Sequence, residues 1–138
     1  MRIRIYQAED RSAVIALWKA CGLLAPQNDP EKDIDRKTRC NPEGFLVGAV
    51  GGNIVATCMA GYDGHRGWIN YLSVSPDHRR RGFGAQMLAA AETLLRKAGC
   101  PKINLQIRST NTDALAFYAA IGFSKDDVVS MGKRLEVD

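Results

Sequence analysis

Short apolar or alternating stretches along the chain predict β-strands, because side chains of a strand point to its two faces in turn. A Gly51–Gly52–Asn53 turn joins two of these stretches as a hairpin. A last hairpin is expected near the end, from residues 123–124 and 128–135. The other expected strands are residues 2–6, 45–50, 54–62, 67–74 and 102–107.

Apolar residues that recur every three or four positions predict helices, since this spacing places them on one face. Asp10 is a candidate cap for the first helix, and Asn28–Asp29–Pro30 is a strong start for the second. The second helix is mostly charged, with Ile34 as its main apolar contact, so it should be an exposed cover. The expected helices are residues 11–21, 29–40, 83–98 and 111–121.

The expected order of elements is β-α-α-β-β-β-α-β-α-β-β. Three consecutive antiparallel strands precede a strand–helix–strand crossover, which places a parallel strand in the same sheet. The fold class is therefore mixed α/β (α+β), with a central sheet covered by helices. At 138 residues, with 46% hydrophobic and 25% charged residues, the chain is expected to form a single domain over residues 1–138.

Charge and cysteine content narrow the classes of partner. The net charge of +4 permits an anionic partner without identifying one. The four cysteines form no CxxC pair, so we expect reduced core thiols and no metal site. The start of the chain carries no recognisable leader, and the longest uncharged stretch is interrupted by glycines. We therefore expect a cytoplasmic protein with no membrane partner.

The most informative stretch is residues 71–84, where a strand runs through an Arg79–Arg80–Arg81–Gly82–Phe83–Gly84 turn into the longest helix. Such a turn exposes main-chain amides and the positive end of the helix dipole, which suits a pyrophosphate. The alternative is a solvated basic turn at a helix start. The glycine spacing does not fit a dinucleotide-binding fold, and no Walker motif is present.

Two blocks of this sequence resemble a known family. The first is Leu72-x-Val74-x-Pro76-x-x-Arg79-x-x-Gly82-x-Gly84, and the second is Asn111-x-x-Ala114-x-x-Phe117–Tyr118-x-x-x-Gly122–Phe123. Both blocks, in this order, are similar to those of the Gcn5-related N-acetyltransferases (GNAT), and the likeness covers essentially the whole chain. It implies the GNAT fold, with a central, mixed and strongly twisted sheet and helices on both faces.

The resemblance also implies a cosubstrate, acetyl-CoA, and roles for residues at matching positions. Leu72 and Val74 would offer backbone groups to the pantetheine arm, and the turn would hold the pyrophosphate. The implied cofactor-binding residues are Leu72, Ser73, Val74, Arg79, Arg80, Arg81, Gly82, Phe83, Gly84, Ala85 and Asn111.

Tyr118 would be the catalytic acid that protonates the departing CoA thiolate. A phenol has an ordinary pKa of about 10 and a thiol one of about 8.5. Proton transfer from the phenol to the thiolate is feasible because it also removes the negative charge of the thiolate. The alternative role for Tyr118 is that of a core aromatic on an amphipathic helix.

The chain departs from the family at the base that deprotonates the amine. The positions where relatives often carry glutamate hold Gln106 and Trp68. Water, an acceptor that is already neutral, or a residue elsewhere would then take the proton. His65, in a turn, is one candidate, and a solvated surface histidine is the alternative. The acidic stretch from Asp29 to Asp35 either attracts a cationic amine or forms a solvated helix face.

Three hypotheses for function follow. The first is an N-acetyltransferase that uses acetyl-CoA and a small-molecule or peptide amine, by direct attack in a ternary complex. The second is a non-catalytic acyl-CoA sensor, motivated by Gln106 and Trp68. Nucleic-acid binding through Arg79–Arg81 ranks last, because the basic cluster is short and lacks stacking aromatics. By analogy with the family, a homodimer is one assembly open to the protein.

Overall fold

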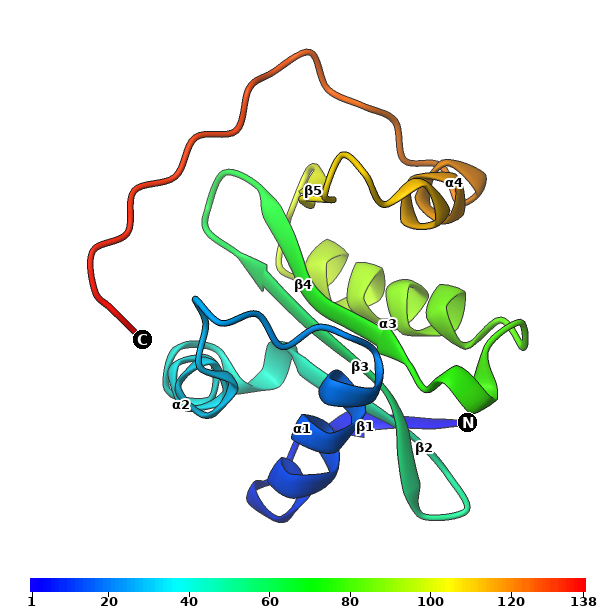
Figure 1. The fold of residues 1–138 in the computed structure, drawn as a ribbon. Helices are drawn as coiled ribbons and strands as arrows, with labels where there is room; N and C mark the ends of the chain where they lie inside the picture. The colour runs from blue at the N-terminus through cyan, green and yellow to red at the C-terminus, as the bar shows by residue number, and fades with distance from the viewer. The chain divides into compact units, whose positions relative to one another are not determined.

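A computed structural model describes all 138 residues, and they divide into two compact units. The first comprises residues 1–104 together with Asp138, and the second comprises residues 105–137. The first unit contains the whole sheet and three of the four α-helices (Figure 1). That the chain forms a single domain stays a prediction.

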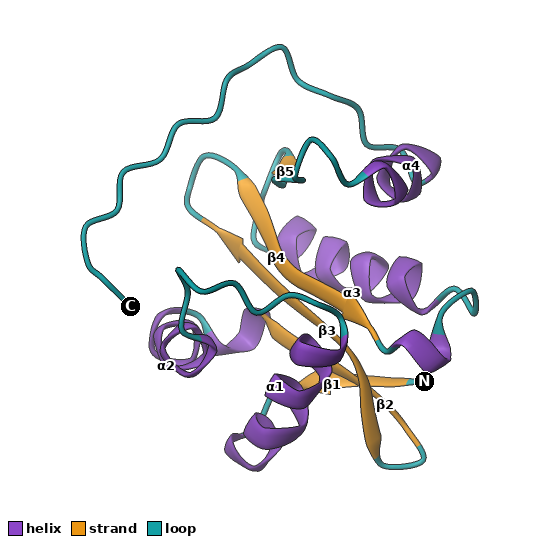
Figure 2. Ribbon diagram, viewed as in Figure 1, coloured by secondary structure: helices purple, strands orange, loops and turns teal.

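The sheet of the first unit has five strands in sequence order, and four of them are antiparallel neighbours. The fifth pairs in parallel with the fourth, so the sheet is mixed, as the crossover predicts (Figure 2). The strands are β1 (Arg2–Ile5), β2 (Phe45–Val50), β3 (Asn53–Tyr62), β4 (Gly67–Val74) and β5 (Ile103–Asn104).

Three helices of the first unit cover the two faces of this sheet (Figure 1). Helices α1 (Arg11–Ala20) and α2 (Pro30–Cys40) pack on one face, and α3 (Phe83–Lys97) packs on the other. The fourth helix, α4 (Thr112–Ala120), belongs to the second unit.

A row of aromatic rings forms the core beneath α1 and α2. Tyr6 stacks on Phe45 with ring centroids 4.3 Å apart, and Trp18 lies 6.3 Å beyond Phe45. Tyr71 stacks on the far side of Trp18 at 3.8 Å, with an interplanar angle of 15°. The stack therefore links the residue that follows β1 with β2, α1 and β4 through large apolar surfaces, which dominate core energetics.

The other face of the sheet packs against α3 through Met87, Leu88, Ala91 and Leu95, all of them buried. Close approach there depends on Gly67 at the start of β4. A Cβ at this position would lie 2.7 Å from Cys100 Sγ and 3.1 Å from a Leu95 methyl carbon, so no larger residue fits without displacement.

The N-terminal helices differ from expectation at one residue. Ile34 is the single buried residue of α2, which confirms that this helix is an exposed cover.

Asp10 does not cap α1, however. Its carboxylate accepts a hydrogen bond from Gln7 N (2.8 Å) and pairs with Arg4 (2.7 and 2.9 Å), because a 3-10 turn over Ala8–Asp10 precedes the helix.

The expected strands after α3 are the least accurate part of the prediction. The strand expected over residues 102–107 is reduced to β5, and the expected hairpin of residues 123–124 and 128–135 is wrong, since no strand follows α4. Val129 and Met131 are 87% and 92% exposed. Alternation alone cannot hold a strand, because a strand also needs a neighbouring strand with which to form hydrogen bonds.

No helix of the chain is both long enough and apolar enough to cross a membrane. All four cysteines are free thiols, but the expectation that they are core residues holds only for Cys58, and Cys40 is exposed. Burial raises the pKa of the Cys58 thiol to about 12, which makes it a poor nucleophile.

We predict that Ile34→Ala lowers the free energy of unfolding by about 3 kcal/mol, because it empties the one wholly buried contact of α2. Urea denaturation would measure this loss. The exposed neighbour Lys32→Ala should change stability by less than about 0.5 kcal/mol. A loss below about 1 kcal/mol for Ile34→Ala would contradict the assignment of Ile34 as the anchor.

A second prediction concerns acid stability. The hydrogen bond from Arg4 holds the pKa of Asp10 below its ordinary value of 3.8, so the folded state favours the ionised carboxylate. This stabilisation is present above that value and is lost as the pH falls through the folded pKa. Stability of Asp10→Asn should therefore vary less with pH below about 4 than that of the wild type. Asp77→Asn, at an exposed site, is the control and should follow the wild-type curve.

Candidate functional site

The fourth strand contains a β-bulge where the family resemblance expects the cosubstrate. Two residues of β4, Tyr71 and Leu72, oppose the single residue Cys58 of β3. Tyr71 takes a left-handed conformation, with φ of 49°, which is uncommon for a residue with a side chain. Such bulges re-aim the backbone beyond them and are common near active sites.

Two contacts fix the side chain of Tyr71. Its ring stacks on Trp18, and its phenol donates a hydrogen bond of 2.6 Å to Asp33 Oδ2 on α2. Burial, and then this bond, raise the pKa of Tyr71 well above the ordinary phenol value, so it stays a neutral donor. The bulge is thereby connected to both helices on its face of the sheet.

Beyond the bulge, β4 has an edge that β5 does not pair with. Parallel pairing ends at Trp68 and Asn104. Ser75 N donates to Val55 O (2.7 Å), so by the alternation of an antiparallel ladder the backbone of Val74 faces away from β3. The Val74 amide can donate to an extended ligand added along this edge, whereas Val74 O already accepts from Cys21 Sγ and Arg79 Nε, both at 3.3 Å.

The turn that follows β4 takes two left-handed residues to reach α3. A 3-10 turn over Pro76–His78 comes first, and Arg79 Nε donates to Val74 O (3.3 Å), which ties the turn to the strand. Arg80 has φ of 64° and Gly82, the N-cap of α3, has φ of 77°. A left-handed arginine costs on the order of 1 kcal/mol, and such strain concentrates at functional sites.

The start of α3 presents unpaired amides. Gln86 N is the amide that closes the first helical turn, onto Gly82 O (3.0 Å). The amides of Phe83, Gly84 and Ala85 come before it and, as the first amides of the helix, have no intrahelical carbonyl to bond. A Cβ on Gly82 would meet no heavy atom within 4 Å, so the space before the helix is open. Free amides, a helix dipole and open space are the features that attract a phosphate group.

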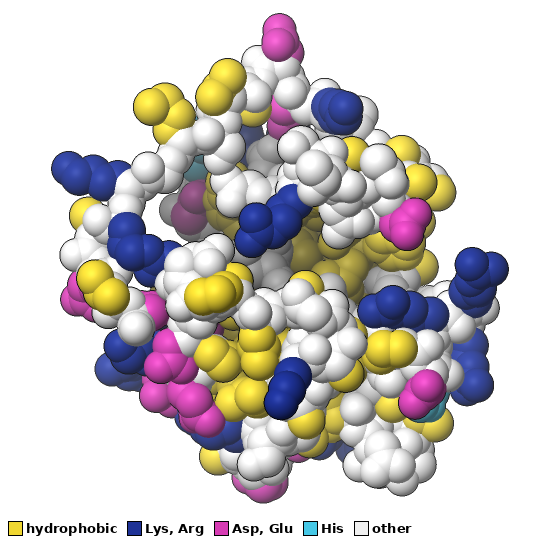
Figure 3. All heavy atoms as spheres, in the orientation of Figure 1, with side chains coloured by type: hydrophobic (Ala, Val, Ile, Leu, Met, Phe, Trp, Pro, Cys, Tyr) yellow, Lys and Arg dark blue, Asp and Glu magenta, His cyan; other side chains and the backbone are white.

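Basic side chains add charge at this point. Arg79, Arg80 and Arg81 are all exposed. Figure 3 shows basic side chains at the right-hand edge, where Figure 1 places this turn, and acidic ones at the lower left, over α2. Ser73 differs from the other expected cofactor residues, because its side chain is buried and hydrogen-bonded inside the sheet.

The second unit carries the remaining two expected site residues. The side chain of Asn111 caps α4, with Oδ1 accepting from Ala114 N (3.1 Å). Tyr118 is half-buried and makes edge-to-face contacts with Phe117 and Phe123, at centroid distances of 5.1 and 5.4 Å. The second sequence block thus builds its own helix start and aromatic cluster.

The residues at the usual carboxylate positions are both occupied in polar contacts. Gln106 donates through its side chain to Ser130 Oγ. Trp68 is 38% exposed and donates from Nε1 to Asp63 Oδ2 (3.1 Å). Backbone hydrogen bonds from Arg66 and then His65 are the main causes that lower the pKa of Asp63, so this carboxylate is a weak base. The His65 side chain itself is exposed.

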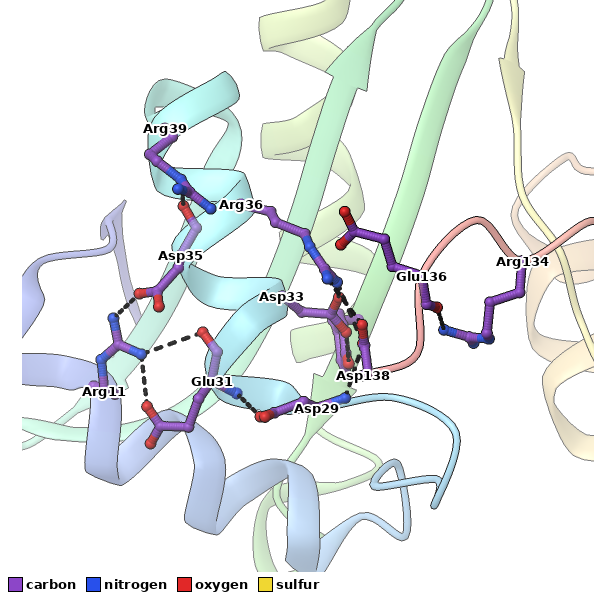
Figure 4. A network of polar contacts seen from close by, with 11 residues as sticks. Arg11, Asp29, Glu31, Asp33, Asp35, Arg36, Arg39, Arg134, Glu136 and Asp138 are labelled. Atoms are coloured by element: carbon purple, nitrogen blue, oxygen red, sulfur yellow. Dashed lines mark hydrogen bonds and ion pairs between the residues drawn. The ribbon is translucent and has the colours of Figure 1, made fainter.

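The acidic stretch of α2 is largely neutralised within the chain, as Figure 4 shows. Arg11 lies between Glu31 and Asp35, at 2.7 and 2.5 Å from their oxygens. Arg36 pairs with Asp138 at 2.8 Å, and this contact, followed by a hydrogen bond from a main-chain amide, lowers the pKa of Asp138. These pairs favour a structural surface over an amine-attracting one.

Comparison with known proteins agrees with this architecture. The family model described as "Acetyltransferase (GNAT) family" matches residues 4–123. An acetyltransferase of Yersinia pestis (strain Pestoides F) is 47% identical over 138 residues, which covers 100% of this chain and 98% of that protein. One of Pectobacterium atrosepticum is 46% identical, with the same coverage.

Among solved structures, the PaiA N-acetyltransferase from Thermoplasma acidophilum in complex with coenzyme A superposes with a TM-score of 0.78. It is 18% identical and covers 93% of this chain and 92% of its own, a likeness that concerns the fold. The fold is therefore that of an acetyltransferase with a mixed, bulged sheet. The chain belongs to the GNAT acetyltransferase family.

Some contacts at the bulge carry no sequence signal. Thr57, which touches Tyr71 and Ser73, reads as an ordinary strand residue, and Asp33 reads as one charge among many on α2. Lys37 on α2, away from the bulge, also carries no sequence signal. Its Nζ donates to Ala60 O (2.6 Å), and burial lowers its pKa. Trp18, which donates to the Thr57 hydroxyl, is wholly buried in the core.

The turn gives a prediction with a matched control. Gly82→Glu should abolish CoA binding, because its carboxylate would stand where the diphosphate is expected. Gly52→Glu puts the same residue at another left-handed glycine with open surroundings (φ of 81°), so both variants carry a strain of about 1–2 kcal/mol. Calorimetric titration with CoA should show binding to Gly52→Glu only. Equal affinity of the two variants would disprove the phosphate assignment.

Proposed function

We propose that this protein is an N-acetyltransferase that transfers the acetyl group of acetyl-CoA to a primary amine by direct attack in a ternary complex. The observation that carries the proposal is the β4–α3 connection, in which a bulged strand with an open edge leads to a helix start with free amides. Family membership supports the same conclusion.

The turn would hold the diphosphate of the cosubstrate. The amides of Phe83, Gly84 and Ala85 would donate to its oxygens, and Arg80 and Arg81 would add fork-shaped charged donors. Leu72 and Val74 would bond the pantetheine arm along the open edge of β4. PaiA, which shares the fold, binds coenzyme A in its crystal structure.

Acetyl-CoA, when bound, supplies a thioester that an amine can attack. The Leu72 amide would donate to the carbonyl oxygen, where negative charge develops as the C–N bond forms. Tyr118 would give its proton to the sulfur as the C–S bond breaks. The proton lost by the amine leaves to water or to a base, and the Tyr118 phenolate is then reprotonated from solvent.

The acceptor and its base are the open parts of this proposal. Trp68 and Gln106 cannot take a proton usefully, and Asp63 is engaged by three donors. We propose that water or an acceptor that is already neutral serves, with His65 as the candidate side chain. The acceptor class stays that of a small-molecule or peptide amine, and the homodimer and the cytoplasmic location stay predictions.

A second function, a non-catalytic acyl-CoA sensor, is favoured by one observation. Both positions where relatives often carry a carboxylate hold side chains that already take part in hydrogen bonds. A sensor would bind acetyl-CoA through the same turn without turning it over.

We predict that the wild type binds CoA and acetylates some members of a panel of primary amines, with release of free thiol as the measured signal. Tyr118→Phe should lower kcat about 100-fold while leaving the Kd for CoA within about twofold, because it removes only the acid. Tyr62→Phe, whose phenol bonds Gly64 O, is the control and should keep full activity.

The outcomes separate the two functions. Binding without turnover of any amine would favour the sensor. Absence of CoA binding at submillimolar concentration would contradict both. Full activity of Tyr118→Phe would leave an acetyltransferase but would remove Tyr118 as its acid.

A further inference from the structure

We propose that Thr57 is a positioning residue for acetyl transfer, because its hydroxyl holds the peptide unit between Tyr71 and Leu72 so that the Leu72 amide points to the thioester oxygen. This inference rests on the proposed function and concerns the same site. Thr57 is wholly buried on β3 and belongs to neither sequence block.

The hydroxyl of Thr57 lies at the centre of a fully used set of hydrogen bonds. It lies 2.8 Å from Tyr71 O, 2.9 Å from Trp18 Nε1 and 2.6 Å from Ser73 Oγ. A hydroxyl has one hydrogen and two lone pairs. Since Trp18 Nε1 can only donate and Tyr71 O can only accept, the Thr57 hydrogen goes to Tyr71 O, and Ser73 donates to Thr57.

This bond fixes the direction of the next amide. Tyr71 C=O and Leu72 N–H belong to one planar peptide unit, and the chain contains no cis peptide bond. In a trans unit the two groups point in opposite directions. Because Tyr71 O points to the Thr57 hydroxyl, Leu72 N–H points in the opposite direction, away from Thr57.

The hydrogen bond from Thr57 also stabilises a backbone conformation of Tyr71 that is unfavourable by itself. Tyr71 has φ of 49°, and a residue with a side chain persists there only when its surroundings enforce it. Loss of the hydroxyl would leave Tyr71 O and Trp18 Nε1 buried without this partner, and the bulge could then relax. A hydrogen bond at the carbonyl end of a peptide unit also polarises the amide at its other end.

A purely structural role for Thr57 makes a different prediction. If the hydroxyl served only to satisfy the buried indole of Trp18, its loss would reduce stability and leave the bound thioester unchanged. The two roles are therefore separated by a signal from the thioester carbonyl itself.

The experiment compares Thr57→Val, which keeps the shape and removes the hydroxyl, with Thr57→Ser, which keeps the hydroxyl. Val47→Ala, at a wholly buried site of β2 in the same core, controls for loss of stability. Infrared spectra of acetyl-CoA labelled with ¹³C at the carbonyl, bound to each protein, report the hydrogen bond to its oxygen. Steady-state rates with an amine found in the panel report kcat and KM.

We expect the carbonyl stretch to fall on binding to the wild type, Thr57→Ser and Val47→Ala, and to stay near its value in solution for Thr57→Val. We expect kcat of Thr57→Val to fall at least tenfold, with the Kd for CoA within about twofold, and Thr57→Ser to restore most of the rate. If Thr57→Val does not fold, Thr57→Cys, with a weak donor of similar size, should give an intermediate carbonyl shift.

The failures are distinguishable. If the wild type does not bind acetyl-CoA, the proposed function itself fails. If it binds and Thr57→Val shows the wild-type carbonyl shift and kcat, only the role of Thr57 is overturned. A loss of rate in Val47→Ala equal to that in Thr57→Val would also overturn it, because stability alone would then explain the effect.

Discussion

One extra residue in the fourth strand is the constraint on which the rest of the site depends. Because Tyr71 and Leu72 together oppose Cys58, β4 changes direction at this point. The buried hydroxyl of Thr57 and the stack on Trp18 hold the bulge in a left-handed conformation that the chain would not adopt unaided. Pairing with β5 stops before the bulge, and the strand then leads directly into the turn before α3.

The candidate site that results consists mainly of backbone groups. The open edge of β4 and the first amides of α3 belong to the main chain, and side chains add charge and fix directions. This division has a physical advantage, because main-chain amides need no rotamer to be ordered before they bind an anion. It also explains why the acceptor is hard to identify from this chain: the contacts expected for the cosubstrate are independent of most side chains, whereas the contacts of an acceptor are not.

The sequence predicts the parts of the fold that depend on local patterns. Glycine turns, helix starts such as Asp29–Pro30 and the apolar face of α3 predict the order of elements correctly through α4, the helix expected over residues 111–121. The last hairpin was wrong because an alternating pattern such as that around Met131 needs a partner strand, which is a tertiary condition. Similarly, the turn before α3 could be recognised from its glycines and arginines, but the network at Thr57 could not. Thr57, Trp18 and Tyr71 lie far apart in sequence, and only the sheet register brings them together.

The proposed function depends on main-chain amides, at the bulge and at the start of α3, that bind the cosubstrate. The most direct measurement is a titration of the ¹⁵N-labelled protein with CoA and with acetyl-CoA, followed by amide NMR. We expect large downfield shifts of the Phe83, Gly84 and Ala85 amides with both ligands, and a further shift of Leu72 with acetyl-CoA. Saturable binding that leaves these four amides unmoved would contradict this expectation.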